Sequence, residues 1–169
     1  MLNIEETKAK EIRNALKHSV TEVIEEFYDR KEDSLPFTKS LKSKLSEKAR
    51  AFEYECAPGN VDGEWLYDVV WYKMGEKDHL IQIGLVMESE VSDRSINGIR
   101  YDFQKLLLSN SPIKVMLCLS LKRDINGVAE IQEKFQEWIN ASENIEPGEE
   151  FLILVWEDCD EGKLYDTLL

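Results

Sequence analysis

The stretch EWLYDVVWYKMGEKDHLIQIGLVMESEVSDRSINGIRYDFQK, from Glu64 to Lys105, decides the fold of this chain. It holds an alternation of apolar and polar residues around Asp68, a turn-rich gap, a nearly all-apolar run over 80–87 and an amphipathic stretch. These patterns predict, in that order, a strand, a turn, a second strand buried on both faces and a helix. The sequence therefore predicts a sheet with a helix packed against it.

Acidic side chains recur where the two strands would meet. Side chains alternate along a strand, so Asp68 lies on one face of the first strand, and Glu88 and Glu90 share one face of the second. In a register that keeps these faces together, Asp68 and Glu88 are cross-strand neighbours, which lie roughly 5 to 8 Å apart. Carboxylates at the end of a buried strand lower the stability of the fold unless a positive charge neutralises them. We therefore expect a divalent cation or a basic side chain beside them.

This arrangement resembles the PD-(D/E)xK nuclease superfamily, which has the restriction-endonuclease-like fold. The superfamily pattern is an acid on one strand, an acid-x-Lys motif on the next strand and then a helix. Asp68 matches the first acid and Glu88 the second, while Glu90 stands where the lysine is expected, as in an E-x-E variant of the family. The first motif lacks its proline. The resemblance implies that Lys105 in DFQKL, or Arg100 in IRYDF, supplies the basic group from the helix.

The resemblance implies a metal-dependent nuclease that hydrolyses phosphodiester bonds with Mg²⁺ or Mn²⁺. In that interpretation Asp68 and Glu88 bind the metal. Glu90 acts as a third ligand or as the base that positions water, and Lys105 stabilises charge that develops on the phosphate.

The rest of the chain predicts the scaffold. An apolar stripe predicts an amphipathic helix over 7–28. The further expected elements are a short helix after Pro36, a strand over 51–56, buried strands over 113–121 and 151–156, a helix around 128–139, and a final edge strand or frayed end. Together they predict one three-layer α/β domain over 1–169, with a central mixed sheet of about five strands flanked by helices.

Several side chains leave alternatives open. First helices in the superfamily often add a glutamate to the site, and a solvated helix face explains the candidates equally well: Glu22, Glu25 and Glu26. The short helix is the most basic stretch, either as a solvated face or as a contact for phosphate or an acidic partner, and it carries Lys39, Lys42, Lys44, Lys48 and Arg50. Three aromatic residues are expected opposite Asp68, in the core against the first helix rather than as stacking platforms for bases: Trp65, Tyr67 and Trp71.

Composition limits the function classes. The 169 residues suit one core, and 43% hydrophobic with 33% charged residues is typical of a soluble globular protein. The net charge of −13 opposes non-specific nucleic-acid binding, which depends on Lys and Arg neutralising phosphates. A second interpretation therefore stands beside the nuclease: a catalytically inactive nuclease-like scaffold that binds a protein partner, as an immunity-type module would.

The sequence also bears on compartment and metal type. No run approaches the roughly 18 apolar residues of a membrane span, and the start lacks the apolar centre of a signal peptide. The three cysteines form no CxxC pair, which argues against structural zinc, and their odd number agrees with a reducing compartment. We expect a cytoplasmic protein without membrane contact.

Overall fold

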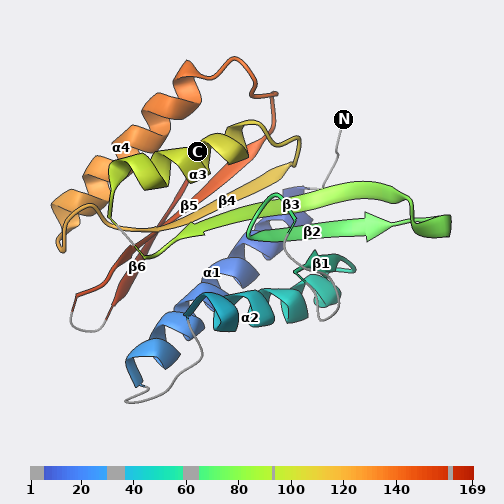
Figure 1. The fold of residues 1–169 in the computed structure, drawn as a ribbon, viewed down its shortest axis with the longest axis horizontal. Coiled ribbons are helices and arrows are strands. Elements are labelled where there is room, and N and C mark those ends of the chain that lie inside the picture. The colour runs from blue at the N-terminus through green and yellow to red at the C-terminus, as the bar shows by residue number, and fades with distance from the viewer. Residues whose placement is uncertain (1–5, 30–36, 59–64, 93, 160–161) are drawn as a thin grey trace.

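The computed structural model describes residues 6–29, 37–58, 65–92, 94–159 and 162–169. In chain order the elements are α1 (Glu6–Asp29), α2 (Phe37–Ala51), β1 (Glu55–Ala57), β2 (Val69–Met74), β3 (Leu80–Glu90), α3 (Ile96–Leu107), β4 (Ile113–Leu119), α4 (Ile125–Ala141), β5 (Glu150–Glu157) and β6 (Lys163–Leu168), with a short 3₁₀ turn at Glu76–Asp78. The β2–β3 hairpin projects beyond the rest of the molecule (Figure 1).

The strands form one mixed sheet in the sequential order β1-β2-β3-β4-β5-β6. Strands β1, β2 and β3 pair antiparallel, β3, β4 and β5 pair parallel, and β6 adds to β5 antiparallel. The predicted α/β class and mixed sheet are confirmed. The sheet has six strands instead of about five, because the C-terminal residues 163–168 form the edge strand that was one of two expectations.

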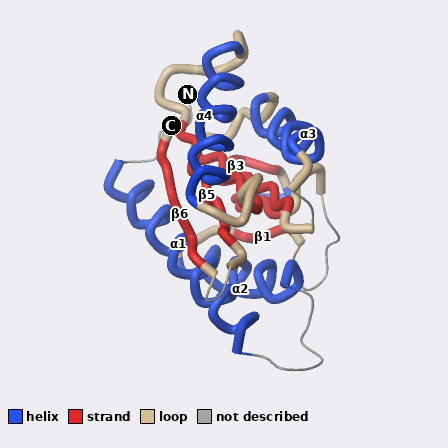
Figure 2. The backbone as a smooth tube through the Cα atoms, turned by 90° about the vertical axis from the view of Figure 1, so that its left-hand side faces the viewer, coloured by secondary structure: helices blue, strands red, loops and turns tan. Residues whose placement is uncertain are grey.

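Helices cover both faces of the sheet, which gives three layers (Figures 1 and 2). The pair α1 and α2 encloses one hydrophobic core, and the pair α3 and α4 encloses the other. Neighbouring residues of the central strands divide between the two cores: Val115 faces the first and Met116 the second. Strand β4 is therefore buried along its whole length, as its apolar sequence predicts. Within the described parts of the chain, no helix combines the length and apolar character needed to cross a membrane.

The predicted strand over 51–56 is wrong in its first half. Helix α2 continues to Ala51, and β1 contains only Glu55–Ala57. Glu53 has a left-handed backbone (φ 64°), so the chain leaves the helix there and turns before it can enter the sheet. The apolar alternation of AFEYEC thus reflects a helix end followed by a short strand.

Two of the three aromatic residues lie on the other side from the one expected. Trp71 packs as predicted in the core of α1 and α2. Trp65 stacks on Tyr72, with 4.5 Å between ring centroids, and Tyr67 packs against the core of α3 and α4. The expectation failed because β2 begins only at Val69, so residues 65–68 do not continue its alternation.

Candidate functional site

The sheet register brings Asp68 and Glu88 together at the start of β2. Val69, the first residue of β2, pairs with Met87, and Asp68 lies just before this pair. Asp68 Oδ2 accepts a hydrogen bond of 2.9 Å from the backbone N–H of Ser89. The first acid is therefore fixed to the strand that carries the second.

Lys105 reaches the second acid from α3. Its Nζ lies 2.8 Å from Glu88 Oε2 and 3.0 Å from Asp102 Oδ1. Lys105 therefore forms both a salt bridge within its own helix and a contact with the acidic strand end. The contact is possible because α3 starts six residues after β3 and packs back over it.

The protonation of this pair depends mainly on burial. Only 2% of the Glu88 side chain is exposed. Burial raises the pKa of Glu88 to about 7, the hydrogen bond from Lys105 opposes that rise, and the negative charge of Asp68 adds to it. Burial lowers the pKa of Lys105, but hydrogen bonds to Glu88 and Asp102 outweigh it, so the net shift is upward. Lys105 thus stays charged while Glu88 titrates close to neutral pH.

The other predicted residues of the site have different partners. Glu90 Oε1 accepts hydrogen bonds from the backbone N–H of Ser92 at 2.9 Å and from its hydroxyl at 2.6 Å. In this arrangement the Glu90 carboxylate stabilises the turn that follows β3. Arg100, the alternative to Lys105, is exposed and donates to Asn97 at 3.2 Å.

The candidate glutamates of the first helix are engaged elsewhere. Lys44 of α2 lies 2.9 Å from Glu22 and 3.3 Å from Glu26. Glu25 lies beside a different hollow, which Glu157 also lines. These contacts agree with the alternative in which the glutamates belong to the helix surface.

Sequence reasoning missed one contact of the acid pair. Lys42 Nζ, from α2, lies 3.4 Å from Asp68 Oδ1. The basic character of α2 was recognised in the sequence, but spacing along the helix could not single out Lys42 from its basic neighbours. The contact spans 26 residues and depends on how α2 packs beside β2.

The acid pair fits a hard divalent cation in one respect. Glu88 Oε1 is buried and makes no hydrogen bond within the described chain, so it remains available as an acceptor. Among the described residues, no three Asp, Glu, His or Cys side chains converge as a metal-binding group. A cation held by Asp68 and Glu88 would therefore retain several waters, which is how Mg²⁺ usually binds.

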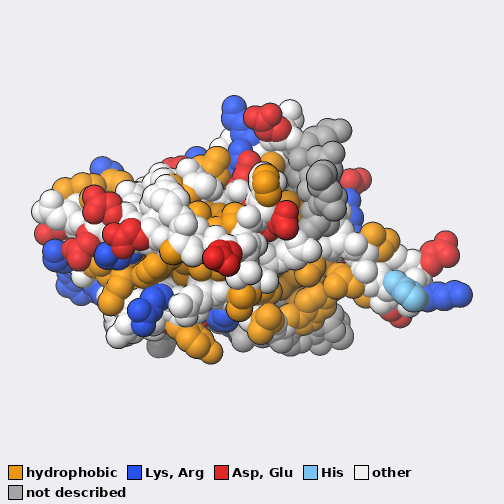
Figure 3. Space-filling model, turned by 90° about the horizontal axis from the view of Figure 1, so that it is seen from above, with side chains coloured by type: hydrophobic (Ala, Val, Ile, Leu, Met, Phe, Trp, Pro, Cys, Tyr) orange, Lys and Arg blue, Asp and Glu red, His pale blue; other side chains and the backbone are white. Residues whose placement is uncertain are grey.

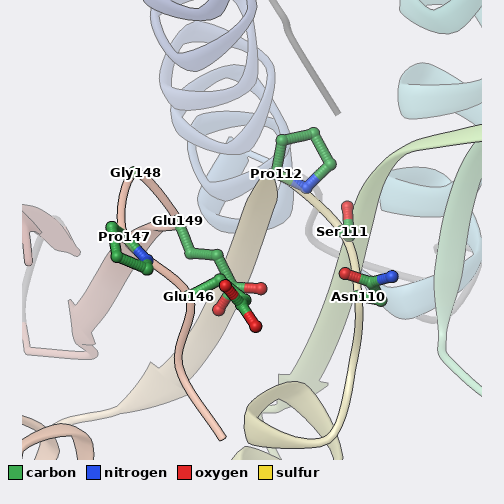
Figure 4. Close-up of a pocket in the computed structure, with 7 residues that line it drawn as sticks. All are labelled: Asn110, Ser111, Pro112, Glu146, Pro147, Gly148 and Glu149. Atoms are coloured by element: carbon green, nitrogen blue, oxygen red, sulfur yellow. The ribbon is translucent and has the colours of Figure 1, made fainter. Parts of the chain in front are cut away.

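A hollow of about 500 Å³ lies at the other end of the sheet, where β4 and β5 begin. Figure 4 shows Glu146 and Glu149 pointing into the same space, across from Asn110. Glu149 is already paired with the fully buried Lys114, at 2.6 Å. Ligands of open α/β sheets usually bind at the carboxyl ends of the parallel strands, so this hollow is the weaker candidate.

Comparison of the chain with models of protein families, with curated proteins and with solved structures found no match. The superfamily resemblance therefore remains a prediction from the motif residues.

Proposed function

We propose that this protein hydrolyses phosphodiester bonds in a reaction that depends on Mg²⁺ or Mn²⁺. The observation that carries the proposal is the placement of a buried carboxylate, Glu88, between Asp68, which lies just before β2, and a lysine from α3. Asp68, Glu88 and Lys105 come from three separate parts of the chain, and a folded chain has no structural need to gather two acids at one strand end.

Each residue has a distinct task in this reaction. Oxygens of Asp68 and Glu88 would hold the cation, which when bound polarises the phosphate and the attacking water. Lys105, fixed by Asp102, would place its ammonium where negative charge develops on the phosphate oxygens. Glu90 has no assigned role while Ser92 occupies its carboxylate.

The net charge of −13 is the main physical objection to a nucleic-acid substrate. Seen from above, however, acidic, basic and apolar side chains are interspersed on the molecular surface (Figure 3). The electrostatic potential at a site depends on the local distribution of charge, which can differ in sign from the total.

One observation favours the non-enzymatic alternative. Both acids already have basic partners, Lys42 for Asp68 and Lys105 for Glu88, so the cluster is neutralised without a metal. A nuclease-like scaffold that binds a protein partner would look the same.

A cleavage assay separates the two functions. Purified protein is incubated with Mg²⁺ or Mn²⁺ and with single- and double-stranded DNA and RNA. Activity should fall about a hundredfold or more in Lys105→Ala, because a preorganised charge is lost. The melting temperature should fall as well, because the change leaves the buried Glu88 without its ammonium partner, so activity is compared at a temperature where both proteins are folded. Lys134→Ala is the control, since Lys134 forms an exposed pair with Glu137 on α4.

Two results would count against the proposal. Cleavage that survives Lys105→Ala would remove Lys105 from the reaction. A wild type that cleaves none of the four substrates with either cation would favour the protein-binding scaffold.

A further inference from the structure

Asp68 is held from two directions. The backbone N–H of Ser89 fixes Oδ2 at 2.9 Å, and Lys42 Nζ lies 3.4 Å from Oδ1. Only 15% of the Lys42 side chain and 25% of the Asp68 side chain are exposed. The position beside Oδ1 is therefore sheltered from water and is occupied by a positive charge.

Lys42 differs from the next lysine on its helix. Lys44 pairs with Glu22 and Glu26 and so links α2 to α1. Lys42 instead leaves the helix toward the residue that precedes β2, beside the buried Leu41. Covered ion pairs contribute little net stability, because desolvation offsets most of their attraction. Stability alone is therefore a weak reason for placing an ammonium group there.

The acid pair lies between two ammonium groups that come from opposite layers. Helix α2 lies on one side of the sheet and α3 on the other (Figure 1). Lys42 approaches Asp68 from the α2 layer, and Lys105 approaches Glu88 from the α3 layer. A phosphodiester anion drawn to the site would thus meet positive charge from both faces of the sheet.

We infer that Lys42 is a positioning residue of this site. In the cation-free protein Lys42 pairs with Asp68, and it moves away from Asp68 Oδ1 when a divalent cation binds there. The inference rests on the proposed function. Once displaced, the Lys42 ammonium remains next to the bound phosphate as a second positive charge beside Lys105. Lys42 therefore opposes cation binding and favours phosphate binding.

The opposite signs of these two effects provide the test. Mn²⁺ binding is titrated calorimetrically, without substrate, in the wild type, Lys42→Met and Lys44→Met. Lys42→Met should bind Mn²⁺ about tenfold more tightly, because a like charge a few ångströms from the cation is removed. Lys44→Met is the matched control on the same helix and should change the affinity less than about twofold. Lys42→Arg keeps the charge and should stay near the wild type.

The second readout uses substrate at saturating Mn²⁺. With an oligonucleotide that the wild type cleaves, Lys42→Met should raise KM severalfold, whereas Lys44→Met should leave it unchanged. Tighter Mn²⁺ binding follows from the loss of any positive charge beside Asp68, so a Lys42 that served only the fold would produce that effect without the weaker substrate binding. Melting curves without cation check that each variant is folded, and Lys42→Gln replaces Lys42→Met if the latter is not.

The inference and the proposed function fail differently. If Mn²⁺ binds, Asp68→Asn abolishes the binding and Lys42→Met leaves the affinity unchanged, then the inference is wrong and the proposed metal site stands. If the wild type binds no Mn²⁺, the proposed function is wrong and the inference falls with it.

Discussion

Replacing Glu88 by Gln tests the electrostatics of the site at its most buried group. The substitution keeps the size of the side chain and one oxygen that can accept from Lys105. Burial raises the pKa of Glu88 from 4.5 to about 7, so the folded protein keeps a proton that the unfolded chain has already released. The stability that this proton provides is fully present below the ordinary pKa and is lost as the pH rises toward about 7.

The expected magnitude follows from the size of that shift. Each pKa unit corresponds to ~1.4 kcal/mol, so a rise from 4.5 to about 7 gives ~3 kcal/mol. Glu88→Gln should therefore match the wild type near pH 4 and exceed its stability by about 2 to 3 kcal/mol from pH 7 upward. For a chain of this size that is about 5 to 10 °C in melting temperature. Lys105 is not left alone in the variant, because Asp102 lies 3.0 Å away.

The assay is urea unfolding of both proteins from pH 4 to 8.5 in the presence of a chelator. Glu133→Gln on the exposed surface of α4 controls for the loss of one negative charge, and it should differ from the wild type by less than ~0.5 kcal/mol. A stability difference that does not vary with pH would refute the reasoning. So would a variant that is less stable than the wild type at pH 8, because the ion pair with Lys105 would then outweigh the cost of burial.

Two further substitutions test the scaffold. Gly84→Ala should destabilise the protein by about 1 to 3 kcal/mol, because an added Cβ would clash with the ring of Tyr54. A chemical unfolding curve equal to that of the wild type would show that the ring can move aside at no cost. Asp124→Ala should lower the free energy of unfolding by about 1 kcal/mol, because the Asp124 side chain caps α4 by accepting a hydrogen bond of 3.0 Å from the Gly127 N–H. Asp124→Asn should keep most of that stability, and equal losses in the two variants would argue against capping.

The sequence predicted the parts of the site that depend on local pattern. The apolar run of the second strand places Glu88 near the end of β3, and the antiparallel pairing of β2 with β3 brings Asp68 to the backbone of Ser89. Helix α3 begins at Ile96, where the amphipathic stretch starts, and this places Lys105 over β3. These features follow from strand and helix periodicity, which a single sequence displays.

The features that the sequence did not predict depend on tertiary packing or on single backbone angles. Lys42 meets Asp68 only because α2 lies on the sheet face opposite α3, and nothing in the spacing of its lysines encodes that. The carboxylate of Glu90 accepts a hydrogen bond from the backbone of Ser92, and such a local bond competes with bonds to more distant partners. The helix end before β1 is set by the left-handed backbone at Glu53, which apolar alternation cannot indicate.

Paramagnetic broadening by Mn²⁺ shows whether Asp68 and Glu88 bind a divalent cation. In a ¹⁵N-labelled sample with Mn²⁺ below one equivalent, we expect selective loss of the backbone amide signals of Asp68, Glu88 and Ser89. The signal of Gly148, in the hollow at the other end of the sheet, should remain. Broadening centred on Gly148 and Glu149, or no selective broadening anywhere, would mean that Asp68 and Glu88 do not hold the cation.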